Sequence, residues 1–354
     1  MSADGLTVML GLVGSGWFVD SGYDQDGAVM KRIRIGMTVA MSVVACGVLL
    51  FAQQSSQSQP PLPGQAGRGA TAGAGDPARG QRGGRGNARV AGQRKRLLAW
   101  ADTRNGVAQH ESVGHALAII ERLGYESGMW DTFIRTDSNI ISKNPRKSDG
   151  SPASGGPNLG NVDAIFYMGH RDVPIDAGQK EELLQFVREG HGFVAAHVGL
   201  VSLDSWPEFL DLLGARFDGH PVSGAGVVIN ESPNFPATKH FPAAFAFSDE
   251  FYQPSEFSRD KIDVLLRLDV KPGTPRVHPD GDYPLAWAKM YGKGRVFFGS
   301  FAHASETWDN RDVQQMYFEA VRWAMGMTDA EPAPHPMRGS AADLPAGRRG
   351  GSPR

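Results

Sequence analysis

Four histidines in the sequence stand at the edges of predicted strands and helices. His197 ends an apolar run, His303 follows another, His110 precedes a predicted helix, and His220 stands in an Asp-Gly-His-Pro segment. Ligands of open α/β sheets bind outside the carboxyl ends of the strands, so histidines that follow strands lie where chemistry is expected. Histidine exchanges protons near neutral pH and also binds divalent metals. The pattern therefore predicts one convergent site for acid–base or metal-assisted chemistry.

The elements that must position these histidines alternate between strand and helix. Apolar runs predict strands at residues 96–101, 129–135, 164–168, 192–197, 264–269, 285–290 and 295–301. Helical spacing of apolar residues predicts helices within residues 113–123, 176–189, 206–213 and 313–324. This alternation is typical of βαβ units and predicts an α/β fold, with a mainly parallel sheet and helices on both faces. Residues 218–253 are expected to form an irregular loop that roofs the site, because long loops in compact domains usually serve function.

Composition excludes several classes of function. The chain has 354 residues and a formal net charge of −2, which gives no electrostatic basis for nucleic acid as a partner. The single cysteine, Cys46, precedes the predicted folded domain, so that domain has neither a disulfide framework nor a cysteine nucleophile. The folded region contains neither a Gly-x-Gly-x-x-Gly motif nor a Walker loop, so no nucleotide cofactor is expected.

The two ends of the chain differ from its middle. A basic segment beginning at Met30 and the apolar residues 35–51 predict a signal peptide and translation starting at Met30, with residues 1–52 as extension plus signal. Export would make the protein periplasmic or secreted, and only an uncleaved segment 35–51 would anchor it in a membrane. Residues 53–93 and 329–354 are rich in Gly, Arg and Pro and are predicted to be a disordered linker and a disordered tail. The folded domain is thus expected at residues 94–328.

Five segments, taken in order, resemble the ThuA-like (trehalose utilisation) family. They are residues 106–113, 192–197, 212–221, 249–252 and 291–303, and the resemblance covers nearly all of residues 94–326. It implies a flavodoxin-like, three-layer fold of the class I glutamine amidotransferase-like superfamily. In amidotransferases the strand corresponding to residues 192–197 ends in a cysteine nucleophile, and here it ends in His197, which excludes amidotransfer. The chain also departs from the family's pattern at Phe235, where a histidine is common.

The residues around this strand end supply the expected site. The predicted catalytic residues are His197, His303, His110 and Glu250, and His110, His197, His220 and His303 are the candidate metal ligands. Alternatives remain for several neighbours: Asp102 could bind a sugar hydroxyl, orient His110 or simply cap its loop. The residues predicted to bind substrate are Asp102, Thr103, His220, Asp249, Tyr252 and Trp206.

The resemblance implies a small-molecule sugar as the substrate. The expected activity is isomerisation of a (keto-)disaccharide or related sugar, in which histidine removes the proton next to a carbonyl. Either a second acid or a bound divalent metal would stabilise the charge that develops on the oxygen. The alternative is a non-catalytic carbohydrate-binding or scaffold domain, which needs no titrating pair of side chains.

Overall fold

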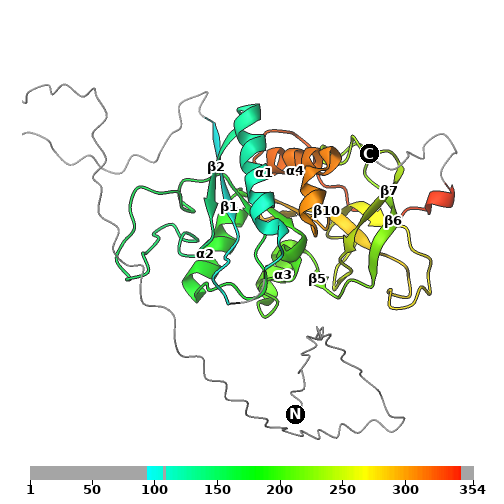
Figure 1. Ribbon diagram of the computed structural model, residues 1–354, viewed down its shortest axis with the longest axis horizontal. Coiled ribbons are helices and arrows are strands. Elements are labelled where there is room, and N and C mark those ends of the chain that lie inside the picture. The colour runs from blue at the N-terminus through cyan, green and yellow to red at the C-terminus, as the bar shows by residue number, and fades with distance from the viewer. Residues whose placement is uncertain (1–93, 107–108, 344–354) are drawn as a thin grey trace, which may run out of the picture. The chain divides into compact units, whose positions relative to one another are not determined.

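The computed structural model describes residues 94–106 and 109–343 (Figure 1). The predicted signal at residues 35–51, the predicted linker at 53–93 and residues 344–354 of the predicted tail lie outside this part. Within the described ranges no helix is both long enough and apolar enough to cross a bilayer.

A nine-stranded mixed sheet forms the centre of the domain. Five strands at one end pair in parallel: β2 (Trp130–Arg135), β1 (Lys95–Trp100), β3 (Ala164–Tyr167), β4 (Gly192–Ala196) and β11 (Gly294–Gly299). Four more continue it in antiparallel pairing: β10 (Pro284–Tyr291), β9 (Asp263–Leu268), β6 (Val222–Asn230) and β7 (Ala244–Phe251). The short strands β5 (Arg216–Phe217) and β8 (Pro254–Ser255) form a separate pair. The parallel part confirms the predicted α/β class.

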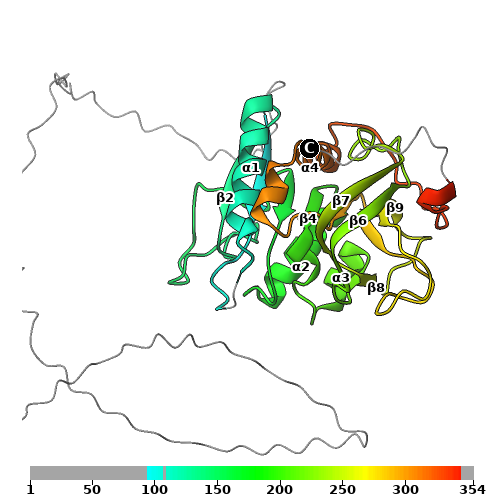
Figure 2. The same cartoon turned by 45° about the vertical axis from the view of Figure 1, so that its right-hand side comes forward.

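Helices cover both faces of the parallel part and make three layers (Figures 1 and 2). Helices α1 (Ser112–Ser127) and α4 (Arg311–Ala324) share one apolar core with Leu97 and Ala99 of β1. Helices α2 (Ala177–Arg188) and α3 (Pro207–Leu213) share the other core with Leu98 and Trp100. Successive side chains of a strand point to opposite faces, so the continuous apolar run of β1 supplies both cores. Short 3-10 helices follow at η1 (His197–Leu200), η2 (Ser305–Asp309) and η3 (Ala341–Asp343).

The helix starts follow local side-chain chemistry. The side chain of Asp176 accepts a hydrogen bond from the backbone N–H of Gln179, and the side chain of Gln179 accepts one from the backbone N–H of Asp176, which makes a capping box at the start of α2. Asn310 caps α4 by accepting from the backbone N–H groups of Asp312 and Val313. These caps fix where the helices begin relative to the strand ends that carry the site.

Residues 218–253 do not form the irregular roof that the sequence predicts. Most of this stretch is the β6–β7 hairpin, which pairs over eight residues and joins the sheet beside β9. The turn is closed by Asn230, whose Nδ2 donates to the carbonyls of Thr238 and Phe241. Phe235 lies in this turn, buried against Trp323. The position where the family commonly has a histidine therefore serves the core here.

The chain continues in ordered contacts beyond the predicted boundary at residue 328. Residues 329–343, which we call the C-terminal strap, lie against β9 rather than forming a disordered tail. Arg267 Nη2 donates to the carbonyls of Arg338 and Gly339, both at 3.1 Å. Asp263 accepts from the backbone of Ala333 at 2.9 Å, so the strap is tied to the sheet along its length. Composition alone predicts a tail because Pro, Gly and Arg dominate this segment, whereas polar side chains of β9 hold it in place.

Ending the chain after Thr328 is expected to lower the free energy of unfolding by about 2 kcal/mol. Each intramolecular hydrogen bond contributes about 1 kcal/mol net, and the truncation removes several strap bonds that include those to the nearly buried Arg267. Urea unfolding of the full chain, a chain ending at 343 and a chain ending at 328 measures the effect. Equal midpoints for the last two would show that the strap contributes nothing to stability.

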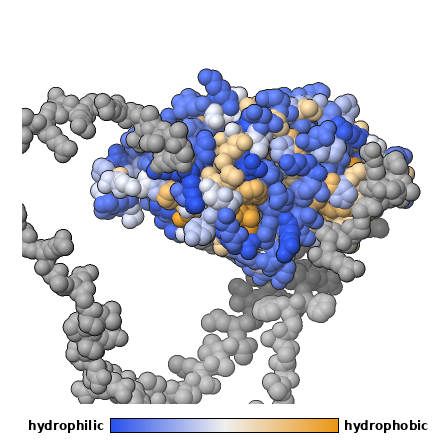
Figure 3. Space-filling model, turned by 90° about the horizontal axis from the view of Figure 1, so that it is seen from above, coloured by the Kyte–Doolittle hydropathy of each residue, from blue (hydrophilic) through white to orange (hydrophobic). Residues whose placement is uncertain are grey.

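The surface seen from above is mostly hydrophilic, and its apolar residues gather in a band near the middle of that face (Figure 3). Among the described residues the most exposed large apolar side chain is Tyr125 of α1, at 70%.

Candidate metal centre

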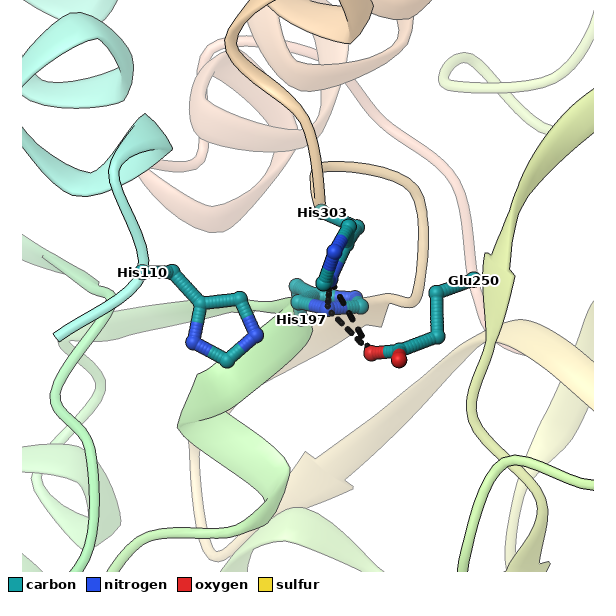
Figure 4. Close-up of side chains that lie close together, drawn as sticks. All are labelled: His110, His197, Glu250 and His303. Carbon is teal, nitrogen blue, oxygen red and sulfur yellow. Dashed lines mark hydrogen bonds and ion pairs between the residues drawn. The ribbon is translucent and has the colours of Figure 1, made fainter. Parts of the chain in front are cut away.

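Four side chains from separate segments converge at the carboxyl edge of the parallel strands (Figure 4). His110 precedes α1, His197 follows β4, His303 follows β11, and Glu250 comes from β7. One possible ligand atom of each lies within 4.8 Å of those of the other three. Strands β4 and β11 are neighbours in parallel pairing, so their carboxyl ends carry His197 and His303 to the same edge. The structure thus brings together the four residues predicted to be catalytic.

Three of the four ligand atoms form a compact triangle. Nε2 of His197 lies 3.3 Å from Nδ1 of His303, and that nitrogen lies 3.0 Å from Oε2 of Glu250. The third side, from His197 Nε2 to the same carboxylate oxygen, is 3.5 Å. Atoms bound to one ion at about 2.0–2.1 Å are about 3.0–3.5 Å from one another. The triangle therefore fits a single divalent ion, and nitrogen with carboxylate donors suits zinc, iron or manganese.

The ring of His197 is held in the orientation that a metal ligand needs. The side chain is fully buried, and its Nδ1 lies 2.7 Å from the carbonyl oxygen of Ser300. A carbonyl only accepts, so Nδ1 carries the proton and Nε2, which faces the centre, keeps its lone pair in the neutral ring. The ring of Tyr252 stacks on the ring of His197, with centroids 3.9 Å apart. A φ of +41° at His197 is rare for a residue with a side chain, and such strain is typical of functional sites.

Glu250 is the anionic member of the group. Contact with His197, followed by the proximity of His303 and His220, lowers the pKa of Glu250 to about 2. The carboxylate is therefore ionised at neutral pH. Nδ1 of His220 lies 3.4 Å from the other carboxylate oxygen, so His220 supports Glu250 rather than joining the four. It was predicted as a metal ligand and substrate contact, and its side chain is 52% exposed at the rim.

Asp249 lies behind the site instead of facing a substrate. Its Oδ1 accepts from the backbone N–H of Glu250 at 2.9 Å, and its Oδ2 accepts from that of Ala302 at 3.0 Å. Burial raises the pKa of Asp249, and neighbouring histidines oppose that shift. Ala302 has φ of +154°, a conformation that side chains rarely adopt. Asp249 therefore joins two ligand-bearing segments, one ending in Glu250 and the other in His303.

Three residues predicted to bind substrate lie outside the cluster. Asp102 is fully buried, and its carboxylate accepts from the backbone of Arg104 at 2.9 Å and from Ser138 at 2.8 Å. It therefore caps its loop, which was one of the alternatives. Thr103 is exposed on the same loop. Trp206 is 7% exposed and stacks on Phe209, so it belongs to a core and does not offer a free ring to a sugar.

The residue that sequence reasoning missed is His170. Its ring centroid lies 5.3 Å from that of His110. The signal was available, because Gly169-His170-Arg171 directly follows the predicted strand 164–168. The rule that singled out His197 and His303 applies equally to this strand end.

His110 is expected to make the metal-free protein less stable as the pH falls from 6.5 to 4. Burial, followed by the charges of His197, His303 and His170, lowers its pKa from 6.5 to about 4. In this window the unfolded chain takes up a proton on His110 and the folded chain does not, so stability falls with pH. A shift of this size corresponds to at most about 3 kcal/mol, reduced because the ring is partly exposed.

Urea unfolding at pH 7 and pH 4.5 in the presence of a chelator measures this effect. His110→Gln should lose less stability over that range than the parent protein. Burial also lowers the pKa of His191 and His240, so these residues too make the protein less stable at low pH. Only the difference between the variant and the parent protein therefore reports on His110. An identical loss in both proteins would contradict the assignment.

The fold and the site together define a flavodoxin-like α/β protein with a histidine and glutamate cluster at the strand ends. Residues 96–324 match the Trehalose utilisation (ThuA) family, and the chain belongs to that family. No curated protein matches the sequence.

Two solved structures have the same fold. One is a ThuA-like protein from Bacteroides uniformis, which is 21% identical, with a TM-score of 0.52 over 67% of this chain and 94% of its own. The other is a ThuA-like protein from Parabacteroides merdae, which is 15% identical, with a TM-score of 0.50 over 68% of this chain and 92% of its own.

Proposed function

We propose that the protein is a metal-dependent enzyme that isomerises a (keto-)disaccharide or related sugar. The observation that carries the proposal is the triangle of His197 Nε2, His303 Nδ1 and Glu250 Oε2, with sides of 3.0 to 3.5 Å. The family's association with trehalose utilisation supports a sugar as the substrate. The predicted signal at residues 35–51 supports a reaction in the periplasm or outside the cell.

Each side chain has a role in the proposed reaction. His197, His303 and Glu250 would hold a divalent ion, which when bound would polarise the substrate carbonyl. His110 lies at the edge of this triangle and is neutral at pH 7, because its pKa is about 4, so it can accept a proton. The hydroxyl of Tyr252 lies 3.4 Å from His110 Nε2, and burial raises its pKa, so it stays protonated and can donate. Together they can take a proton from one substrate atom and supply one to another.

The test combines metal analysis with hydrogen exchange. The purified protein is analysed for bound metal by mass spectrometry and then incubated with 3-keto-trehalose in deuterium oxide. Proton loss next to the carbonyl appears in NMR spectra as deuterium incorporation, whether or not the product accumulates. We expect about one equivalent of metal, and exchange that stops in the presence of a chelator and in His110→Gln.

A matched control is His115→Gln on α1, which changes a histidine outside the cluster. Metal binding without exchange, combined with unchanged sugar affinity in His197→Gln, would favour the carbohydrate-binding alternative. A protein that holds no metal after incubation with zinc, manganese and iron would contradict the proposal.

A further inference from the structure

The loop after β3 lies next to the site and is fixed by hydrogen bonds to its backbone. Asn105 Nδ2 donates to the carbonyl of His170 at 2.6 Å. The next carbonyl, that of Arg171, accepts from Ser202 Oγ at 2.8 Å and from the backbone of Leu203 at 3.2 Å. Arg171 adopts φ of +60°, a backbone conformation that is unfavourable for a residue with a side chain. Three hydrogen bonds therefore fix the backbone of His170 and Arg171, and they stabilise the unfavourable φ of Arg171.

This conformation places Arg171 beside the proposed proton-transfer pair. The ring of its neighbour His170 lies 5.3 Å from that of His110. The backbone of Arg171 is therefore fixed next to a histidine that borders the cluster, and its exposed side chain extends from that position.

Arg171 differs from the other arginines near this edge of the sheet. Arg104 pairs with Asp102 at 3.2 Å, and Arg135 pairs with Asp137 at 2.6 Å. Arg171 is exposed, and within residues 94–106 and 109–343 no carboxylate is in ion-pair contact with its guanidinium. An arginine with five donors and no anionic partner is suited to bind a carboxylate or phosphate through two parallel hydrogen bonds.

The charges of the site favour an anionic ligand. A divalent ion together with Arg171 outweighs the carboxylates of Glu250 and Asp249, so the occupied site carries net positive charge. We propose that Arg171 binds a negatively charged group of the substrate, and that the substrate class is therefore an anionic sugar carrying a carboxylate or a phosphate. This inference rests on the proposed function, because it takes the metal centre as the place where the sugar reacts.

The test compares sugars that share a ring and differ in charge. D-Glucose, D-glucuronate and D-glucose 6-phosphate are titrated into the zinc-incubated full chain at low salt, with binding followed by NMR. The same titrations are made with Arg171→Gln and with Arg122→Gln, which removes an exposed arginine on α1. Bound zinc is measured in every sample.

We expect at least one anionic sugar to bind about tenfold more tightly than glucose, as a charge-assisted contact allows. That preference should vanish in Arg171→Gln and persist in Arg122→Gln, with zinc content unchanged. If glucuronate binds more tightly than glucose 6-phosphate, the group that Arg171 binds is a carboxylate; the reverse order identifies a phosphate.

Three results would overturn the inference: equal binding of all three sugars, no binding of any, or a preference that survives in Arg171→Gln. The last would mean that the anion binds the metal directly. Failure of the metal centre gives a separate signature, because zinc would then be absent while a preference that depends on Arg171 could still be seen.

Discussion

Replacing His303 by alanine is expected to weaken divalent-metal binding by at least about 100-fold, more than the loss of a supporting residue usually costs. His303 Nδ1 is a corner of the triangle, 3.0 Å from Glu250 and 3.3 Å from His197. Its side chain is 42% exposed, so its removal leaves no buried cavity and the fold should remain intact. Competition against a calibrated chelator measures the affinity.

The matched control is His115→Ala, because its side chain is 31% exposed and it also pairs with a carboxylate, that of Asp309. This variant should bind metal as tightly as the parent protein. If both variants kept the parent affinity, Glu250 and the histidines would form only a hydrogen-bonded cluster, and the metal-dependent function would have to be abandoned.

The part of the fold that carries the site could be predicted because its signals are local. Buried parallel strands are continuous apolar runs, as residues 192–196 are, and an amphipathic helix shows its period within a few turns. The hairpin of residues 222–251 escaped prediction because Ser223, Gly224 and Gly226 interrupt the alternation of β6. Its pairing with β7 depends on residues about twenty positions away, which no local pattern shows.

The residues of the site that directly follow strands could be predicted from the sequence. His197 and His303 follow neighbouring parallel strands, so one rule locates both. Glu250 could be named as a candidate, but its approach to them depends on the antiparallel half of the sheet. Asp102 shows the limit of the rule, because a carboxylate at a strand end can turn inward to Ser138 as readily as outward to a ligand.

The sequence also could not show which of two adjacent acids is a metal ligand and which one positions the ligands. Asp249 and Glu250 are adjacent acids, and the sequence gives no reason to assign them different roles. In the fold one carboxylate faces the histidines and the other binds two backbone N–H groups. The difference arises because successive side chains of β7 point to opposite sides of the strand.

Asp249 therefore provides the second large expected effect. Asp249→Ala should lower the free energy of unfolding by about 3 kcal/mol, because it leaves the backbone N–H groups of Glu250 and Ala302 without their carboxylate acceptor. It should also weaken metal binding by about 10–100-fold, as the loss of groups that orient ligands does. The reason is geometric: Glu250 and the segment of His303 would no longer be held to one another through Ala302.

Measuring both quantities separates positioning from general stability. Metal affinity is determined at a temperature where circular dichroism shows the variant to be folded, alongside Asp172→Ala, which removes an exposed acid from a neighbouring loop. Asp249→Asn should fall between the parent and Asp249→Ala, because an amide supplies one acceptor and sets its N–H₂ against the other N–H. Unchanged metal affinity in folded Asp249→Ala would mean that the triangle is held by packing around Tyr252 and the Ser300 carbonyl alone, and that the buried carboxylate serves stability only.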